Sequence, residues 1–222
     1  MMAYRSPHVG LLLLLLVGAA PALAASLQVV DAIDGTPLAG AVVEVHHPGS
    51  YLPRSDNDII QRDATFIPHV SLVPAGSRVS FPNRDTTRHH VFSFSPAKPF
   101  ELELYLQETP PPLAFDRAGV VVLGCNIHDH MRAFLVVSDA PTAAMTDADG
   151  RVSLADLPPG THALRVWHPR LEDTHQMWWE GTIDAEESRS VALELRATQT
   201  APSEPSALQK RFREALEDRA SE

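Results

Sequence analysis

The sequence predicts an all-β protein built of β-sandwiches, and three observations lead to this prediction. Apolar and polar residues alternate with a period of two, as in 101–105 and 162–167, which is typical of strands with one buried face. Glycine, proline and Asp-Gly pairs separate these runs. The runs are short and numerous, as in sandwich folds. We expect strands near residues 26–30, 41–45, 77–81, 90–95, 100–105, 120–124, 133–137, 152–154, 162–167 and 190–195.

Residues 1–24 have the pattern of a secretory signal peptide. Arg5 and His8 precede six consecutive leucines, and the apolar run ends in the small-residue sequence Ala22-Leu23-Ala24. This run is shorter than the roughly 20 residues that span a bilayer, and no later run approaches that length. We therefore expect cleavage after Ala24 and a periplasmic mature chain without a membrane span.

Composition excludes several classes of protein. The formal net charge of -10 and the lack of a basic cluster argue against a nucleic-acid binder, because affinity for phosphates comes mostly from clustered Lys and Arg. No Gly-x-Ser-x-Gly, His-Glu-x-x-His or glycine-rich phosphate loop occurs, so we expect the protein not to be an enzyme. The single cysteine, Cys125, cannot form an internal disulfide. An exported protein with one thiol usually buries it or binds a metal through it.

One small domain is predicted to be interrupted by another. Residues 30–45 resemble the first hairpin of a carboxypeptidase regulatory-like, transthyretin-type sandwich, and a similar pattern resumes at 146–166. Asp149-Gly150 suits a tight hairpin turn better than a calcium loop. The resemblance implies a domain of residues 25–48 plus 142–197, with 49–141 inserted, which is permitted because the ends of an inserted domain often lie close together. Two unrelated β-domains in series are the alternative.

The last residues, 198–222, are predicted to be a linker followed by a short helical tail. The linker is rich in Thr, Pro and Ser, and Leu208, Phe212 and Leu216 then recur at helical spacing.

One group of residues has the composition of a metal site. Cys125, His128 and Met131 follow an apolar strand at spacings of three, and His89, 36 positions before the cysteine, starts another predicted strand. A type 1 copper site needs a soft thiolate, two imidazoles in a roughly trigonal plane and a weak axial thioether. These four residues are of the required types.

Residues 83–91 and 125–132 resemble the amicyanin- and plastocyanin-like cupredoxins, and most of the mature chain is similar to the methylamine utilization protein family. The resemblance implies a cupredoxin-type Greek-key sandwich over 49–141. It also implies one type 1 copper site, cycling between Cu(I) and Cu(II), with His89, Cys125, His128 and Met131 as ligands. The implied function is a periplasmic carrier of single electrons, whose redox partner is a c-type cytochrome or a periplasmic dehydrogenase.

Two features leave the ligand set open. Most cupredoxins carry Asn after the first ligand histidine, but this chain carries His90, and strand alternation would turn His90 inward if Phe92 and Phe94 defined the core. His130 adds a further imidazole, either at the rim or as part of a CysHis3 zinc site with Cys125, His128 and His89. A third interpretation makes Cys125 a small buried hydrophobe without any metal.

Two other functions remain compatible with the same residues. A copper trafficking or storage protein would use these ligands but release the metal readily. A non-redox binding module with a vestigial cupredoxin domain would bind no metal.

Overall fold

The computed structural model describes residues 25–196, which contain seventeen strands and no helix. The all-β prediction is therefore confirmed for this range. The predicted signal peptide and the helical tail lie outside it. Among the described residues, none forms a helix of the length and hydrophobicity needed to cross a bilayer. The strands are β1 (Ala25–Asp31), β2 (Val42–His46), β3 (Asp56–Asp58), β4 (Ile60–Arg62), β5 (Thr65–Ile67), β6 (Val70–Pro74), β7 (Ser77–Ser80), β8 (His89–Ser93), β9 (Phe100–Tyr105), β10 (Leu113–Phe115), β11 (Gly119–Gly124), β12 (Arg132–Ser138), β13 (Thr142–Met145), β14 (Arg151–Leu154), β15 (Thr161–Trp167), β16 (Trp179–Asp184) and β17 (Ser188–Leu193).

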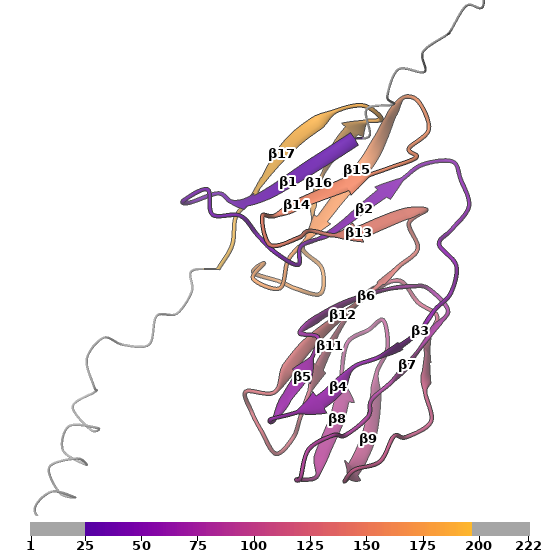
Figure 1. Cartoon of the computed structure of the whole chain (residues 1–222), viewed down its shortest axis with the longest axis vertical. Helices are drawn as coiled ribbons and strands as arrows, with labels where there is room; N and C mark the ends of the chain where they lie inside the picture. Colours follow the sequence, from indigo (N-terminus) through magenta and orange to yellow (C-terminus); the bar gives the residue numbers. More distant parts are fainter. Residues whose placement is uncertain (1–24, 197–222) are drawn as a thin grey trace, which may run out of the picture.

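The strands divide into two groups that lie one above the other in Figure 1. The upper group consists of the sheets β14-β1-β17 and β13-β2-β15-β16. The lower group consists of the five-stranded sheet β6-β12-β11-β8-β9, the three-stranded sheet β10-β7-β3 and the hairpin β4-β5. Every strand of the lower group lies between β2 and β13 in the chain, so the upper sheets join strands from both sides of it.

The central strands β11 and β12 are buried on both faces. Val121, Leu123 and Leu135 pack in the core of the lower group, whereas Val120 and Phe134 belong to the core that contains the upper sheets. This division follows from the period-2 alternation of side chains along a strand. The loop that contains Cys125, His128 and Met131 therefore connects two strands that are each packed against both cores.

A tryptophan side chain lies at the contact between the two groups. Trp167 is fully buried, and its ring centroid lies 5.5 Å from that of Phe134 on β12. Trp178 and Trp179 are half-buried against the same core.

The predicted turn at Asp149-Gly150 is present between β13 and β14. Gly150 has a φ of 68°, and a Cβ at this position would lie 2.5 Å from the carbonyl oxygen of Val29. The carboxylate of Asp147 accepts hydrogen bonds from the backbone N–H groups of Asp149 and Arg151. Those hydrogen bonds stabilise the predicted turn. It does not close a hairpin, because β13 pairs with β2 and β14 pairs with β1, in two different sheets.

Seven strands were not predicted: β3, β4, β5, β6, β10, β13 and β16. Most are only three or four residues long, which is too short for the alternation of apolar and polar residues to show. The turn of the β4-β5 hairpin contains Asp63 and Ala64, both at positive φ, where a glycine or asparagine signal would be expected.

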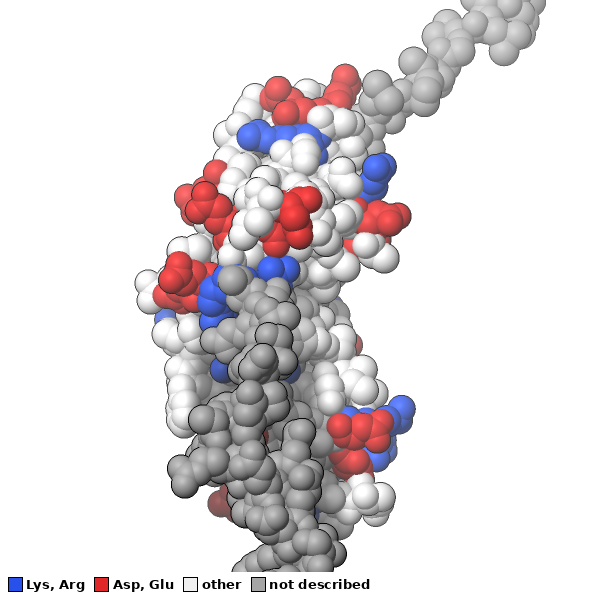
Figure 2. Space-filling model, turned by 90° about the vertical axis from the view of Figure 1, so that its left-hand side faces the viewer, with Lys and Arg blue, Asp and Glu red and all other residues white. Residues whose placement is uncertain are grey.

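Charge is mixed on the face shown in Figure 2. Lys and Arg side chains lie beside Asp and Glu there, and no broad basic patch is seen on the described residues of this face.

Stability should depend on the protonation of His168. Burial, with a smaller effect of Arg170, lowers the pKa of His168 from 6.5 to about 4. The folded state therefore favours neutral His168, and this contribution to the free energy of unfolding is complete above pH 6.5 and lost as the pH falls to about 4. The shift corresponds to about 3 kcal/mol.

We expect His168→Asn to remove this dependence of stability on pH, because the side chain of asparagine does not titrate. Its amide oxygen can still accept the hydrogen bond that Arg170 N–H donates to His168 Nδ1. Denaturant unfolding of the wild type and the variant between pH 4 and 7 measures how the free energy of unfolding depends on pH. The difference in unfolding free energy between wild type and variant should shrink as the pH falls. A constant difference across this range would contradict the assignment.

Candidate metal centre

The hairpin between β11 and β12 carries three of the four predicted ligands. Antiparallel pairing from Gly119↔Val137 to Gly124↔Arg132 fixes both ends of the loop, residues 125–131. Within the loop, Met131 N–H donates to the carbonyl oxygen of His128 at 2.9 Å. Cys125 begins the loop and Met131 ends it, so both residues are attached directly to paired strands.

The pairing of β8 with β11 brings the fourth predicted residue to this loop. Gly124 lies opposite Phe92 in an antiparallel register. Continuing that register past the end of β11 moves toward His89, the first residue of β8. The pairing of these two strands thus brings His89 close to Cys125, which is 36 residues later in the sequence.

Three side chains converge at the end of this sheet. Cys125 Sγ lies 3.8 Å from His128 Nδ1 and 4.0 Å from His89 Nδ1. The three donor atoms all lie within 4.8 Å of one another. His89 is fully buried, Cys125 is buried, and His128 is half-buried. The same nitrogen, Nδ1, faces the sulfur in both histidines.

These separations suit three ligands around one ion. With bonds of about 2.3 Å to sulfur and about 2.0–2.1 Å to nitrogen, ligands at about 120° are separated by about 3.8 Å, and ligands at the tetrahedral angle by about 3.6 Å. The distances from Cys125 Sγ are closer to the first value. The two sulfur-nitrogen distances are therefore close to those of a trigonal arrangement of one sulfur and two nitrogens.

Met131 is the remaining predicted ligand, at the end of the β11-β12 loop. It is 2% exposed and packs in the same core cluster as Cys125. Both residues also line one cavity of about 370 Å³. A thioether in this position offers a soft, neutral sulfur of the kind found as a weak axial ligand in blue-copper sites.

The structure separates His90 from this group. His90 lies on the other face of β8, where its Nε2 is 2.8 Å from Oε1 of Glu101. Phe94 is 85% exposed, so the face that carries Phe92 and Phe94 is not the core face. His89 is thus the residue of the pair that meets Cys125.

His130 also lies outside the converging group. It is exposed, and its ring centroid is 6.0 Å from that of His128. The four residues of a CysHis3 zinc site are therefore not assembled, because the group formed by the described residues stops at His89, Cys125 and His128.

Asn83 organises the loop before His89, a role that sequence reasoning did not assign. It is buried, and its Nδ2 donates to the carbonyl oxygens of Thr87 and Tyr105 at 3.0 and 2.8 Å. Its Oδ1 accepts a hydrogen bond from Asp85 N–H. One amide side chain thus connects β9 to both ends of the turn that leads into His89.

Asp85 was also missed. Its Oδ2 lies 2.8 Å from His89 Nε2 and accepts a hydrogen bond of 2.8 Å from the backbone N–H of Ala64. The Ala64 hydrogen bond, followed by that of His89, holds the pKa of Asp85 below its usual value. The spacing of four residues between Asp85 and His89 was visible in the sequence, but the contact depends on a loop shape that the sequence did not reveal.

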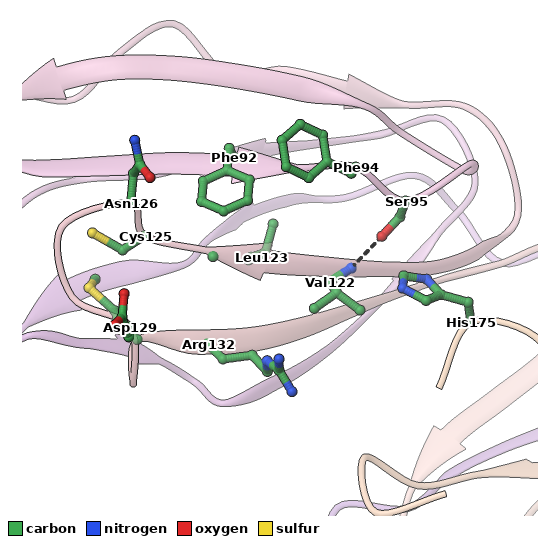
Figure 3. Close-up of a pocket in the computed structure, with 12 residues that line it drawn as sticks. Phe92, Phe94, Ser95, Val122, Leu123, Cys125, Asn126, Asp129, Arg132 and His175 are labelled. Carbon is green, nitrogen blue, oxygen red and sulfur yellow. Dashed lines mark hydrogen bonds between the residues drawn. The ribbon is translucent and has the colours of Figure 1, made fainter. Parts of the chain in front are cut away.

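The cavity beside Cys125 extends along the outer face of the sheet. Figure 3 shows Cys125 in the loop after β11, with Phe92 and Phe94 along the neighbouring chain and His175 approaching from a separate loop. Phe92 lies over Gly124, where a Cβ would come within 2.9 Å of its ring. The glycine before Cys125 therefore gives this aromatic ring space to pack beside the site.

Comparison with known proteins gave structural likenesses only. No family model and no curated protein matches the chain. A copper-containing nitrite reductase from Thermus scotoductus SA-01 is 22% identical over 43% of this chain and 25% of its own, with a TM-score of 0.36. A reduced Cu(I) amicyanin mutant is 17% identical over 43% of this chain and 98% of its own, with a TM-score of 0.35. A purple cupredoxin from Nitrosopumilus maritimus is 20% identical over 36% and 96%, with a TM-score of 0.30.

Asn83→Ala should destabilise the chain. The substitution leaves the buried carbonyl group of Tyr105 without the donor that Asn83 now supplies, at a cost of about 1–3 kcal/mol, and it also removes the hydrogen bond to the more exposed Thr87. Urea unfolding measures the change, with Arg84→Ala at the exposed neighbouring position as control. Equal stability of the two variants would show that Asn83 does not anchor the loop.

Proposed function

We propose that this protein is a type 1 copper protein that carries single electrons between redox partners. The observation that carries the proposal is the convergence of Cys125 Sγ with Nδ1 of His89 and His128. Those three atoms and the Met131 sulfur would hold the copper ion. Copper in such a site accepts and releases one electron by alternating between its cupric and cuprous forms.

The donor set supports copper over other common metals. Thiolate and thioether are soft ligands that select copper, whereas magnesium, calcium and manganese prefer oxygen. Structural zinc sites have four protein ligands of sulfur, nitrogen or carboxylate oxygen, and the described residues bring only three of that kind together.

The surroundings of the ligands support electron transfer without substrate chemistry. His89, Cys125 and Met131 are all buried, and their loops are attached to paired strands and to Asn83. A site that holds its ligands in one arrangement requires little rearrangement when the charge of the ion changes. We infer a carrier and not an enzyme, because three converging donor atoms, with Met131 as a fourth ligand, would leave no open coordination position for a substrate.

His128 is the proposed point of electron exchange. It is half-buried, unlike the other three proposed ligands, and it follows Ile127, which is 49% exposed. An apolar side chain beside a partly exposed ligand suits brief contact with another protein. The proposed partner is a c-type cytochrome or a periplasmic dehydrogenase, possibilities that rest on the resemblance to methylamine utilization proteins.

Export and domain organisation belong to the same proposal. The signal pattern of residues 1–24 supports a periplasmic location. The strand order supports a cupredoxin domain of residues 49–141 inserted into a regulatory-like sandwich, since β1, β2 and β13 to β17 form the two upper sheets.

Addition of one equivalent of Cu(II) to the purified mature protein tests the proposal. We expect an intense visible band from charge transfer between thiolate and copper, and narrow copper hyperfine splitting in the paramagnetic resonance spectrum. Cys125→Ser should abolish the band. A colourless protein, or one with the spectrum of a tetragonal site, would contradict the proposal.

Two histidine variants provide matched controls. His90→Ala and His130→Ala each remove an imidazole within two residues of a proposed ligand but outside the converging group, so both should keep the band. Loss of colour in His90→Ala would show that the ligand assignment is wrong. Release of copper to a competing chelator within minutes would instead favour the trafficking alternative.

A further inference from the structure

The imidazole of His89 has a carboxylate on the side that faces away from Cys125. Asp85 Oδ2 is 2.8 Å from Nε2, while Nδ1 points to the sulfur. His89 is fully buried, so solvent does not compete for Nε2. An ionised carboxylate only accepts hydrogen bonds, which requires the proton of the neutral ring to be on Nε2. Nδ1 is then left with a free lone pair directed toward Cys125.

Asp85 is itself held in place by a second segment of the chain. Its Oδ2 also accepts the backbone N–H of Ala64, at the tip of the β4-β5 hairpin. That hairpin is joined to the loop by two further backbone hydrogen bonds, from Gln61 N–H to Pro82 O at 2.9 Å and from Arg84 N–H to Gln61 O at 2.8 Å. The hairpin therefore positions the carboxylate, and the carboxylate positions the ring.

We propose that Asp85 is the positioning residue of His89, and that its charge lowers the reduction potential of the copper site. The inference rests on the proposed copper function. A carboxylate bonded to the outer nitrogen of a ligand histidine fixes the tautomer and ring orientation and makes the ligating nitrogen more basic. A more basic ligand stabilises the more highly charged form of the ion.

Charge balance leads to the same direction of effect. The Cys125 thiolate and the Asp85 carboxylate together neutralise a cupric ion, whereas reduction leaves one negative charge uncompensated beside the buried ring of His89. An uncompensated charge in a buried site is costly. Asp85 therefore favours the oxidised form, and its removal should raise the potential.

The chain provides a matched control on the opposite face of the same strand. His90 Nε2 and Glu101 Oε1 form a histidine-carboxylate pair of the same length, 2.8 Å, but His90 does not face Cys125. Asp85→Asn and Glu101→Gln each replace a histidine-bonded carboxylate by its isosteric amide. Only the first substitution alters a carboxylate that contacts a proposed ligand.

Redox titration of the copper-loaded proteins tests the effect on potential. We expect Asp85→Asn to shift the one-electron equilibrium toward the reduced form about tenfold, or about 59 mV. Glu101→Gln should shift it much less. Equal shifts in the two variants, or no shift in Asp85→Asn, would overturn the proposal. Asp85→Ala, which also removes the hydrogen-bond acceptor, should bind copper about 10- to 100-fold more weakly in competition with a chelator.

Nitrogen-15 NMR of the protein without copper separates this proposal from the proposed function. Wild-type His89 should be the Nε2–H tautomer, whereas Asp85→Ala should populate the Nδ1–H form. A wild-type Nδ1–H tautomer would overturn the role of Asp85 whatever metal the protein binds. If wild type shows the Nε2–H tautomer but no blue band, the positioning role stands, and the copper function and the effect on potential fail.

Discussion

The antiparallel pairing of β11 with β12 on one side and β8 on the other is the constraint on which the site depends. It places a seven-residue loop and the first residue of β8 at one end of a sheet, and so brings Cys125, His128 and His89 together. Because β11 and β12 are buried on both faces, this arrangement is supported by both hydrophobic cores. The packing between the two groups of strands, centred on Phe134 and Trp167, therefore supports the metal centre as well as the fold.

Around this loop, hydrogen bonds of polar residues set the positions of the turn before His89 and of the His89 ring. Asn83 connects the turn before His89 to β9, and Asp85 connects His89 to the β4-β5 hairpin. Each polar group is buried or partly buried and has a hydrogen-bond partner, which a low-dielectric environment requires. This combination holds the candidate ligands in one arrangement, which is what the proposed one-electron carrier would need.

Much of the fold could be predicted from the sequence, because alternation of apolar and polar residues is a local signal. The strands that contain residues 101–105 and 162–167 were evident for this reason. The short strands β4 and β5 were not, since their turn uses Asp63 and Ala64 at positive φ without the usual glycine. In the site, residue types and spacing indicated Cys125, His128 and Met131, but the choice between His89 and His90 depended on which face of β8 is buried. Asp85 and Asn83 contact residues two and four positions away, but these contacts depend on the shape of the loop before His89. Hydrogen bonds to β9 and to the β4-β5 hairpin help to set that shape, so alternation along the sequence did not reveal it.

X-ray absorption at the copper edge, on the protein loaded with one equivalent of copper, tests the central claim most directly. The account predicts one short copper-sulfur bond and two copper-nitrogen bonds from imidazole, in both oxidation states and with little change between them. A coordination shell of nitrogen and oxygen only, without a sulfur neighbour, would contradict it.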